Sequence, residues 1–453
     1  MSYTPHTPED VRKALEKIGV AQIGELFEHI PAALRDPELD MSPPMDEVEL
    51  LAHLRELAQK NEPASTLLGG GVRKHYIPSV VSHLAMQSEF VTSYTPYQPE
   101  VAQGILQATF EYQTMMSELT GLPVSNASMY DGATAAAEAA LLAIRHTGRE
   151  RVLVSQGMNP EYREVLETYL LPMGFQVGKL ELEDLTTPVA AVGGDVAAVL
   201  VQQPNFLGYI EEMEGLARAA REAGALFISV VDPLSLALLK PPGEYGADVA
   251  VGDGQSIGNP LSFGGPHFGF MVVREELIRQ MPGRLVGETT DVDGRRGYVL
   301  TLQAREQHIR RARAKSNICS NHQLMAIMAG IHLSALGPQG LSEAAAASVA
   351  NAHDLAGALS SAGYGVLTGK RFFNEFVVKL DENAGATSRK LTRRGTSGGI
   401  PVPREYGLGE ALLLSATELT TGEEISRFVS ALDDVAPSAR MVARSGVSTR
   451  TET

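Results

Sequence analysis

Short apolar segments alternate with helical ones from about residue 125 onward, and this alternation constrains the fold more than any other feature. The apolar segments have the length of buried strands and cover residues 152–154, 196–201, 226–231, 249–251 and 268–273. Helix candidates lie between several of them, over residues 161–171 and 213–223. Strands and helices in this order form βαβ units, in which helices cover both faces of a mostly parallel sheet. The pattern therefore predicts an α/β fold.

Helical patterns precede this region, and a mixed pattern follows it. Thr7, Pro8 and Asp10 match a capping box that opens a first helix. The other early helix candidates cover residues 46–60 and 101–119. Beyond about residue 330, the helix candidates are 341–362, 387–394 and 422–433, and the strand candidates are 376–380 and 412–416. We therefore expect an N-terminal helical segment (1–75), a large α/β domain (76–330), a small C-terminal α+β domain (331–435) and a disordered tail (436–453).

Charge and composition exclude several classes of function. The formal net charge of −16 disfavours binding to nucleic acid or to anionic membranes. The sequence has no uninterrupted apolar run of the roughly 18 residues that a membrane span needs, and its start lacks the apolar core of a signal peptide. The single cysteine, Cys319, suits a reducing compartment. The histidines show no metal-ligand spacing. We expect a cytoplasmic protein without a metal site.

Three local features mark a candidate ligand site. A glycine turn at residues 130–135 precedes an alanine-rich helix, and helix N-termini bind anions. Asp232 follows the apolar segment 226–231, at the strand end where such folds bind ligands. The third feature is segment 248–256, followed by Gly-Gly-Pro-His at 264–267. In order and spacing they resemble the phosphate site, the pyridine-binding aspartate and the Schiff-base segment of the aspartate-aminotransferase-like pyridoxal-phosphate fold, fold type I.

Two positions depart from the chemistry of that fold. No lysine lies between Lys240 and Lys315, and by the resemblance the cofactor-binding lysine falls at Ser256. A serine hydroxyl cannot form an imine with the cofactor aldehyde. Asp131 stands at the helix-capping position, where its carboxylate would occupy the N–H groups that a phosphate needs. We therefore expect Asp131, Asp232 and Ser256 to be degenerate cofactor positions, and this chain to bind no pyridoxal phosphate itself.

Six longer segments carry a more specific resemblance. They are residues 69–73, 94–100, 110–115, 126–134, 263–269 and 303–311. With them the chain resembles, over nearly its whole length, the amino-terminal-half subunit of glycine dehydrogenase (decarboxylating), the P protein of the glycine cleavage system.

The resemblance implies an enzyme made of two kinds of chain. A second chain of similar fold would hold pyridoxal phosphate on its lysine, and this chain would pair with it in a dimer of heterodimers. The assembly would decarboxylate glycine and pass the aminomethyl group to the lipoyl arm of the H protein, beside the T and L proteins of the same system. The present chain would have no certain catalytic residue and would help to close the partner's active site.

Several residues are candidates for the edge of that active site. Tyr94, Tyr97, Gln98 and Glu100 lie in a proline-punctuated loop and could position glycine or the lipoyl arm; a packed turn is the alternative. Two further candidates are His267 and Asn317. His267 could act as an acid or base, or it could simply be held in its glycine turn by backbone hydrogen bonds. Asn317 could face the partner's site, or it could cap the chain locally.

The segment 303–315 is strongly basic in this acidic protein. Its cations are Arg305, Arg310, Arg311, Arg313 and Lys315. We expect them to form interface ion pairs or to support the active-site wall, with Glu306 and Arg310 paired along a helix. A solvated helix face and a nucleic-acid patch are the alternatives, and the net charge argues against the latter.

Two other functions stay open at this point. A stand-alone pyridoxal-phosphate lyase or decarboxylase would have to use Lys240, which follows Asp232 too closely for the usual geometry. A non-enzymatic scaffold could also have inherited the fold.

Overall fold

The computed structural model describes residues 6–35, 37–61, 65–190 and 192–437. This described chain divides into two compact units, one up to Glu62 and one from Pro63 onward. The tail predicted over residues 436–453 lies, from residue 438 on, outside the described residues.

The first unit consists of short helices that bury none of their described residues. Helix α1 (Pro8–Ile18) begins with the predicted capping box of Thr7 and Asp10, and α2 (Glu47–Gln59) begins with a second one at Asp46. Thirteen large apolar side chains of this unit are exposed among the described residues: Ile18, Ile23, Leu26, Phe27, Leu34, Leu39, Met41, Met45, Val48, Leu50, Leu51, Leu54 and Leu57. The described residues of this unit therefore form no apolar core of their own.

The second unit contains, in its described residues, a seven-stranded sheet of order β2-β8-β7-β6-β5-β3-β4. Its strands are β2 (Val124–Ser125), β3 (Arg151–Ser155), β4 (Gln176–Leu180), β5 (Val196–Gln203), β6 (Leu226–Val231), β7 (Val249–Asp253) and β8 (Gly269–Val273). Strands β3 to β7 pair in parallel, and β8 runs antiparallel to both β7 and β2. The central strands β5 and β6 are almost wholly buried, as expected when helices cover both faces.

Helices on both faces bury this sheet. The α-helices of the large domain are α3 (Ser79–Ala85), α4 (Ser88–Val91), α5 (Gln103–Thr120), α6 (Gly132–Thr147), α7 (Pro160–Leu170), α8 (Met213–Glu222), α9 (Pro242–Tyr245) and α10 (Gln307–Arg310). The alanine-rich α6 packs against β5 to β8, while α8 packs against β5 and β6. A hairpin of β9 (Leu285–Thr290) and β10 (Arg296–Thr301) lies against α5.

Helix α11 (Gln323–Ser361) connects the large and small domains. By length and composition alone it would pass as a membrane span. Its path is interrupted at Gly337, which has φ 62° and ψ −178° and is followed by Pro338, and the helix packs against α3, α5 and α13 (Gly422–Val435). Its buried residues, among them Ile327, Leu341 and Leu355, belong to the apolar core.

The small domain is built on a second sheet. Within the described residues its order is β11-β12-β15-β14, with all pairs antiparallel. The elements are β11 (Gly365–Val366), β12 (Glu375–Lys379), α12 (Ala384–Thr392), β13 (Thr396–Gly398), β14 (Ile400–Pro401), β15 (Ala411–Ser415) and α13. Strand β1 (Ser65–Leu67) pairs with β13, so the chain passes this domain before it enters the large one.

The structure confirms the predicted α/β large domain with a smaller α+β domain. The predicted helices and strands are present, most of them with ends shifted by one or two residues. Several features were missed. Strand β4, helix α3 and the β9–β10 hairpin were not predicted, and the helix predicted over 341–362 begins already at Gln323.

Candidate functional site

A cavity of about 440 Å³ opens at the carboxyl ends of β5, β6 and β7, where parallel sheets bind ligands. Its walls come from the segment before α3, the starts of α7 and β12, and the ends of the three strands. The polar side chains that define its chemistry are Arg73, Tyr162, Asp232, Asp253, Ser256 and Glu375. No lysine is among the described residues that line it.

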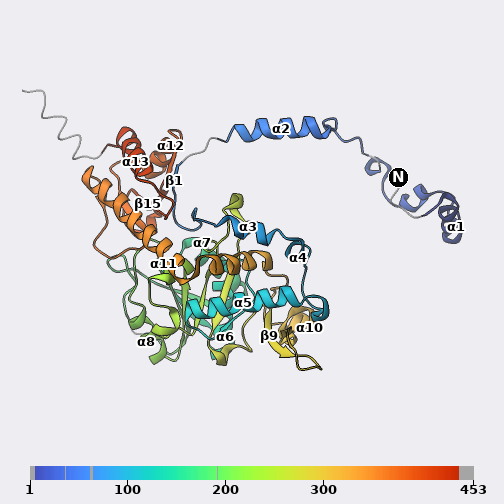
Figure 1. Cartoon of the computed structure of the whole chain (residues 1–453), viewed down its shortest axis with the longest axis horizontal. Helices are drawn as coiled ribbons and strands as arrows, with labels where there is room; N and C mark the ends of the chain where they lie inside the picture. Colours follow the sequence, from blue (N-terminus) through green and yellow to red (C-terminus); the bar gives the residue numbers. More distant parts are fainter. Residues whose placement is uncertain (1–5, 36, 62–64, 191, 438–453) are drawn as a thin grey trace, which may run out of the picture. The chain divides into compact units, whose positions relative to one another are not determined.

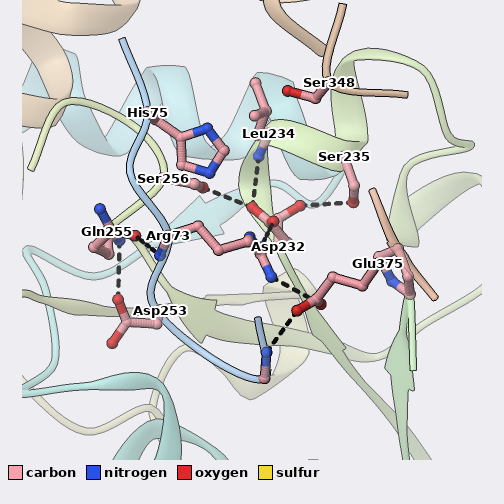
Figure 2. Close-up of polar contacts among 12 residues, drawn as sticks. Arg73, His75, Asp232, Leu234, Ser235, Asp253, Gln255, Ser256, Ser348 and Glu375 are labelled. Atoms are coloured by element: carbon pink, nitrogen blue, oxygen red, sulfur yellow. Dashed lines mark hydrogen bonds and ion pairs between the residues drawn. The ribbon is translucent and has the colours of Figure 1, made fainter. Parts of the chain in front are cut away.

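Both carboxylate oxygens of Asp232 are engaged by groups of the chain itself (Figure 2). Its Oδ1 accepts from the Ser256 hydroxyl at 2.6 Å and from the backbone N–H of Leu234 at 3.1 Å. Its Oδ2 is ion-paired with the guanidinium of Arg73. The predicted pair of Asp232 and Ser256 is therefore brought together at one point, but both residues are engaged with the protein itself.

Arg73 bridges the large and small domains. Besides Asp232, its guanidinium donates to Oε2 of Glu375 on β12 at 2.8 Å (Figure 2). Oε1 of Glu375 accepts in turn from the backbone N–H of Gly70 at 2.6 Å. Burial alone would lower the pKa of the guanidinium, but the charges of Glu375 and Asp232 outweigh it and raise the pKa. Arg73 thus stays charged between two carboxylates, and all three residues are largely buried.

Asp131 caps α6, as the sequence predicts. Its Oδ1 accepts from the backbone N–H of Thr134 at 2.8 Å, and the two residues form a capping box. Tyr162 closes the same helix end, since a Cβ added to Gly132 would lie 2.1 Å from the tyrosine hydroxyl oxygen and 2.7 Å from the backbone nitrogen of Asp253. Burial raises the pKa of Tyr162 well above its usual value, and the charges of Asp253, Asp131 and Asp232 add to this.

Removing the cap tests how much it holds α6. Asp131→Ala is expected to lower the free energy of unfolding by about 1 kcal/mol, because the N–H of Thr134 loses its acceptor. Asp131→Asn keeps a capping oxygen and should change the free energy of unfolding by only a few tenths of a kcal/mol. Chemical denaturation of both variants measures the difference, and equal losses would show that the charge, rather than the cap, matters.

Asp253 is a second titratable group of the cavity whose pKa is raised. Burial raises its pKa to about 6, although the backbone N–H of Gln255 donates to Oδ1 at 2.9 Å and lowers it in part. The sequence placed Asp253 in the Schiff-base segment without assigning it a role.

His267 lies beside this region but outside the lining of the cavity. It is buried, its backbone oxygen faces Nδ1 of His322 at 2.5 Å, and its own Nε2 has no hydrogen-bond partner among the described residues. An acid or base role for His267 stays a prediction.

The other predicted edge residues lie on the surface, away from the cavity lining. Tyr94 is 80% exposed and Tyr97 is 42% exposed, and Gln98, Glu100 and Asn317 are also exposed. The Tyr97 ring packs against His308 with 5.1 Å between ring centroids, and it lies 5.6 Å from the guanidinium carbon of Arg284. The structure therefore brings Asp232 and Ser256 together in the cavity, places Asp131 at the N-terminus of α6, and leaves the exposed candidates outside the lining.

Lys240 lies outside the lining of the cavity. Its ammonium forms an ion pair with Glu214 of α8 at 2.5 Å, and 48% of the side chain is exposed. A lyase that uses this lysine is not favoured by the structure.

A second buried network holds the segment that carries Arg73. His75 is 7% exposed, and its Nδ1 lies 3.0 Å from Oε2 of Glu418, which also accepts from the Ser348 hydroxyl at 2.8 Å. Oε1 of Glu418 accepts from the backbone N–H of Tyr76. Burial would raise the pKa of Glu418, but the hydrogen bond and charge of His75 outweigh it, and the pKa falls to about 2. No local pattern along the chain signals this network.

The fold is that of the pyridoxal-phosphate-dependent enzymes of fold type I. Among solved structures, the fold is shared with a sphingosine-1-phosphate lyase of Burkholderia pseudomallei, at TM-score 0.63 and 18% identity over 92% of this chain and 97% of that one. The fold is also shared with a Lactobacillus brevis glutamate decarboxylase, at TM-score 0.67 and 12% identity over 88% of this chain and 95% of that one.

Closer relatives narrow the assignment. The family model described as glycine cleavage system P-protein matches residues 1–432, so the chain belongs to that family. A protein of Moorella thermoacetica named probable glycine dehydrogenase (decarboxylating) subunit 1 is 49% identical over 95% of this chain and 99% of its own, and a Thermotoga maritima protein of the same name is 48% identical with the same coverage. A crystal structure of glycine decarboxylase (P-protein) in inhibitor-bound form gives TM-score 0.89 and 55% identity, covering 96% of this chain and all of that one.

Proposed function

We propose that this chain is the subunit of a two-chain glycine dehydrogenase (decarboxylating) that does not hold pyridoxal phosphate. It pairs with a second P-protein chain, which anchors the cofactor, and the pair decarboxylates glycine and transfers the aminomethyl group to the lipoyl arm of the H protein. The observation that carries the proposal is the ion pair between Arg73 and Asp232.

The residues of the cavity do not fit the cofactor. The positive guanidinium of Arg73 and the hydroxyl of Ser256 already engage Asp232, the carboxylate that would pair with a pyridine nitrogen. The α6 N-terminus, which would take the phosphate, is capped by Asp131 and closed by Tyr162. No described lining residue offers an amine for the aldehyde. The pyridine nitrogen, the phosphate and the aldehyde of the cofactor thus each meet an obstacle, and the three obstacles differ in chemistry.

Two features support a permanent partner. The names of close relatives as subunit 1 imply a second subunit. The first unit of this chain leaves its apolar side chains exposed, and obligate interfaces are built from such residues. The loop of Tyr94, Tyr97, Gln98 and Glu100 is exposed and could reach the partner's active site. We further propose a dimer of heterodimers, located in the cytoplasm and working with the T and L proteins.

Reconstitution tests the proposal directly. The purified chain, incubated with pyridoxal phosphate and reduced with borohydride, is expected to carry no label, whereas the neighbouring chain encoded with it should be labelled on one lysine. Exchange of bicarbonate into glycine should need both chains and a lipoyl acceptor. A labelled Lys240 peptide, or exchange by this chain alone, would contradict the proposal.

A further inference from the structure

Four cations without an ion pair among the described residues follow β10 in the chain, and a fifth, Arg279, precedes β9. We define the arginine patch as the side chains of Arg279, Arg310, Arg311, Arg313 and Lys315. The four arginines are exposed, and none of the five cations forms an ion pair within the part of the chain that the structure describes. The predicted pairing of Glu306 with Arg310 is wrong, because the Arg310 Nε donates to the backbone oxygen of Ala304 instead. In a protein of net charge −16, such a group of cations calls for an external partner.

Lys315 lies among positive charges from inside and outside the patch. The ammonium of Lys315 donates to the backbone oxygen of Arg279 at 2.9 Å, which ties the two parts of the patch together. Burial lowers the pKa of Lys315, and the neighbouring charges of Arg145, Arg305 and Arg310 lower it further. An anionic surface placed here would relieve this repulsion.

Two buried carboxylates beside the segment, Glu306 and Glu138, do not pair with the patch. Glu306 is buried and faces Arg284 at 3.9 Å and His308 at 3.6 Å. Glu138 is buried in α6 and accepts from the Ser316 hydroxyl at 2.8 Å. Both acids point into the protein, so the positive charge of the patch faces solvent.

The segment that carries the patch is anchored at its base. The Arg305 guanidinium donates to the backbone oxygens of Met281 and Gly283, and the Arg284 guanidinium donates to the backbone oxygen of Ser320 at 2.9 Å. The patch also adjoins the predicted edge loop, because His308 of α10 packs against Tyr97 (α10 is labelled in Figure 1). A molecule seated on the arginines therefore lies next to the Tyr94–Glu100 loop.

Exposed, uncompensated arginines suit a transient partner better than a permanent one. Charged residues are depleted in the cores of permanent interfaces, whereas complementary charges accelerate the encounter of proteins that bind and leave. We propose that the arginine patch docks an acidic surface of the lipoylated H protein and thereby brings its arm to the Tyr94–Glu100 loop. This inference rests on the proposed function, in which the H protein is the partner that must come and go in every turnover.

The test compares two acceptors on the reconstituted two-chain enzyme. The variant is Arg310→Glu, Arg311→Glu and Arg313→Glu combined; the matched control reverses three exposed arginines of the small domain, with Arg389→Glu, Arg393→Glu and Arg404→Glu. With lipoylated H protein, the patch variant should lose roughly ten- to hundred-fold in kcat/KM, mainly through KM, and should lose the salt dependence of the reaction. With free lipoate, which needs no docking, the rates of variant, control and parent should agree within about two-fold.

Other outcomes overturn the inference in distinguishable ways. Equal kcat/KM of patch variant and control with H protein would show that the carrier docks elsewhere. An equal loss with free lipoate would assign the patch to assembly or to the active-site wall. If the parent enzyme turns over neither acceptor, the proposed function fails, and a calorimetric titration of H protein into the complex still decides the docking by the change in Kd. Tighter, salt-sensitive binding of a mixed-sequence RNA than of H protein would make the patch a nucleic-acid site.

Discussion

Replacing Arg73 with methionine should lower the free energy of unfolding of the purified chain by about 3–5 kcal/mol. The reason is the environment of the guanidinium, which is 9% exposed and pairs with Asp232 and Glu375. Methionine fills a similar volume but carries no charge, so the variant buries two carboxylates without a partner. Equilibrium denaturation, monitored by circular dichroism at neutral pH, measures the loss.

A compensated variant separates charge from packing. If the unpaired carboxylates cause the loss, then Arg73→Met combined with Asp232→Asn and Glu375→Gln should recover most of the stability, because neutral groups are much easier to bury. Arg73→Lys should retain only part of the stability that Arg73→Met loses, since an ammonium cannot reproduce the forked geometry toward two acids. A triple variant as unstable as Arg73→Met would show that the shape of the arginine, and not its charge, holds the two domains.

The ion pair also explains how Asp232 is paired in the absence of a pyridinium nitrogen. A pyridinium nitrogen and a guanidinium offer the same thing to Asp232, namely a positive N–H donor. Arg73 supplies it from within the chain, and by reaching Glu375 it ties the strand end of the large domain to β12 of the small one. The cavity has thereby become part of the interior that keeps the domains together, which agrees with a chain whose proposed task is to support an active site on its partner.

Local signals account for what the sequence could predict. The βαβ alternation, the caps at Thr7 and Asp131, and the strand end at Asp232 depend on residues within a few positions of one another, and the structure confirms all of them. The resemblance supplied Ser256 as the position of the missing lysine, and the structure places its hydroxyl on Asp232.

What was missed depends on residues far apart in the chain. Arg73 pairs with Asp232 across 159 positions and with Glu375 across 302, and no periodicity carries such information. Gly337 and Pro338 look like the end of a helix in sequence, yet packing against α5 and α13 keeps α11 together around the interruption. Tyr162 likewise gave no sign that it would close the N-terminus of a different helix.

Glu418 is expected to make the stability of the chain depend on acid pH. Its pKa falls from the usual 4.5 to about 2 on folding, since hydrogen bonds and the charge of His75 outweigh burial. A carboxylate with a depressed pKa contributes stability above its unfolded pKa and loses it as the pH falls toward the folded one. Glu418→Gln should therefore lower the free energy of unfolding by roughly 2–3 kcal/mol at pH 6–7, and the difference from the parent should shrink as the pH falls from about 4.5 toward 2.

The matched control is Glu423→Gln, which removes a carboxylate that pairs with Arg427 on the surface of α13. Because exposed pairs contribute at most about 1 kcal/mol, this variant should remain close to the parent at every pH. Denaturation curves from pH 3 to 7 compare the three proteins. A deficit of Glu418→Gln that stays constant over that range would mean that the shape of the network, and not the ionised carboxylate, anchors Tyr76 and His75 beside the Arg73 segment.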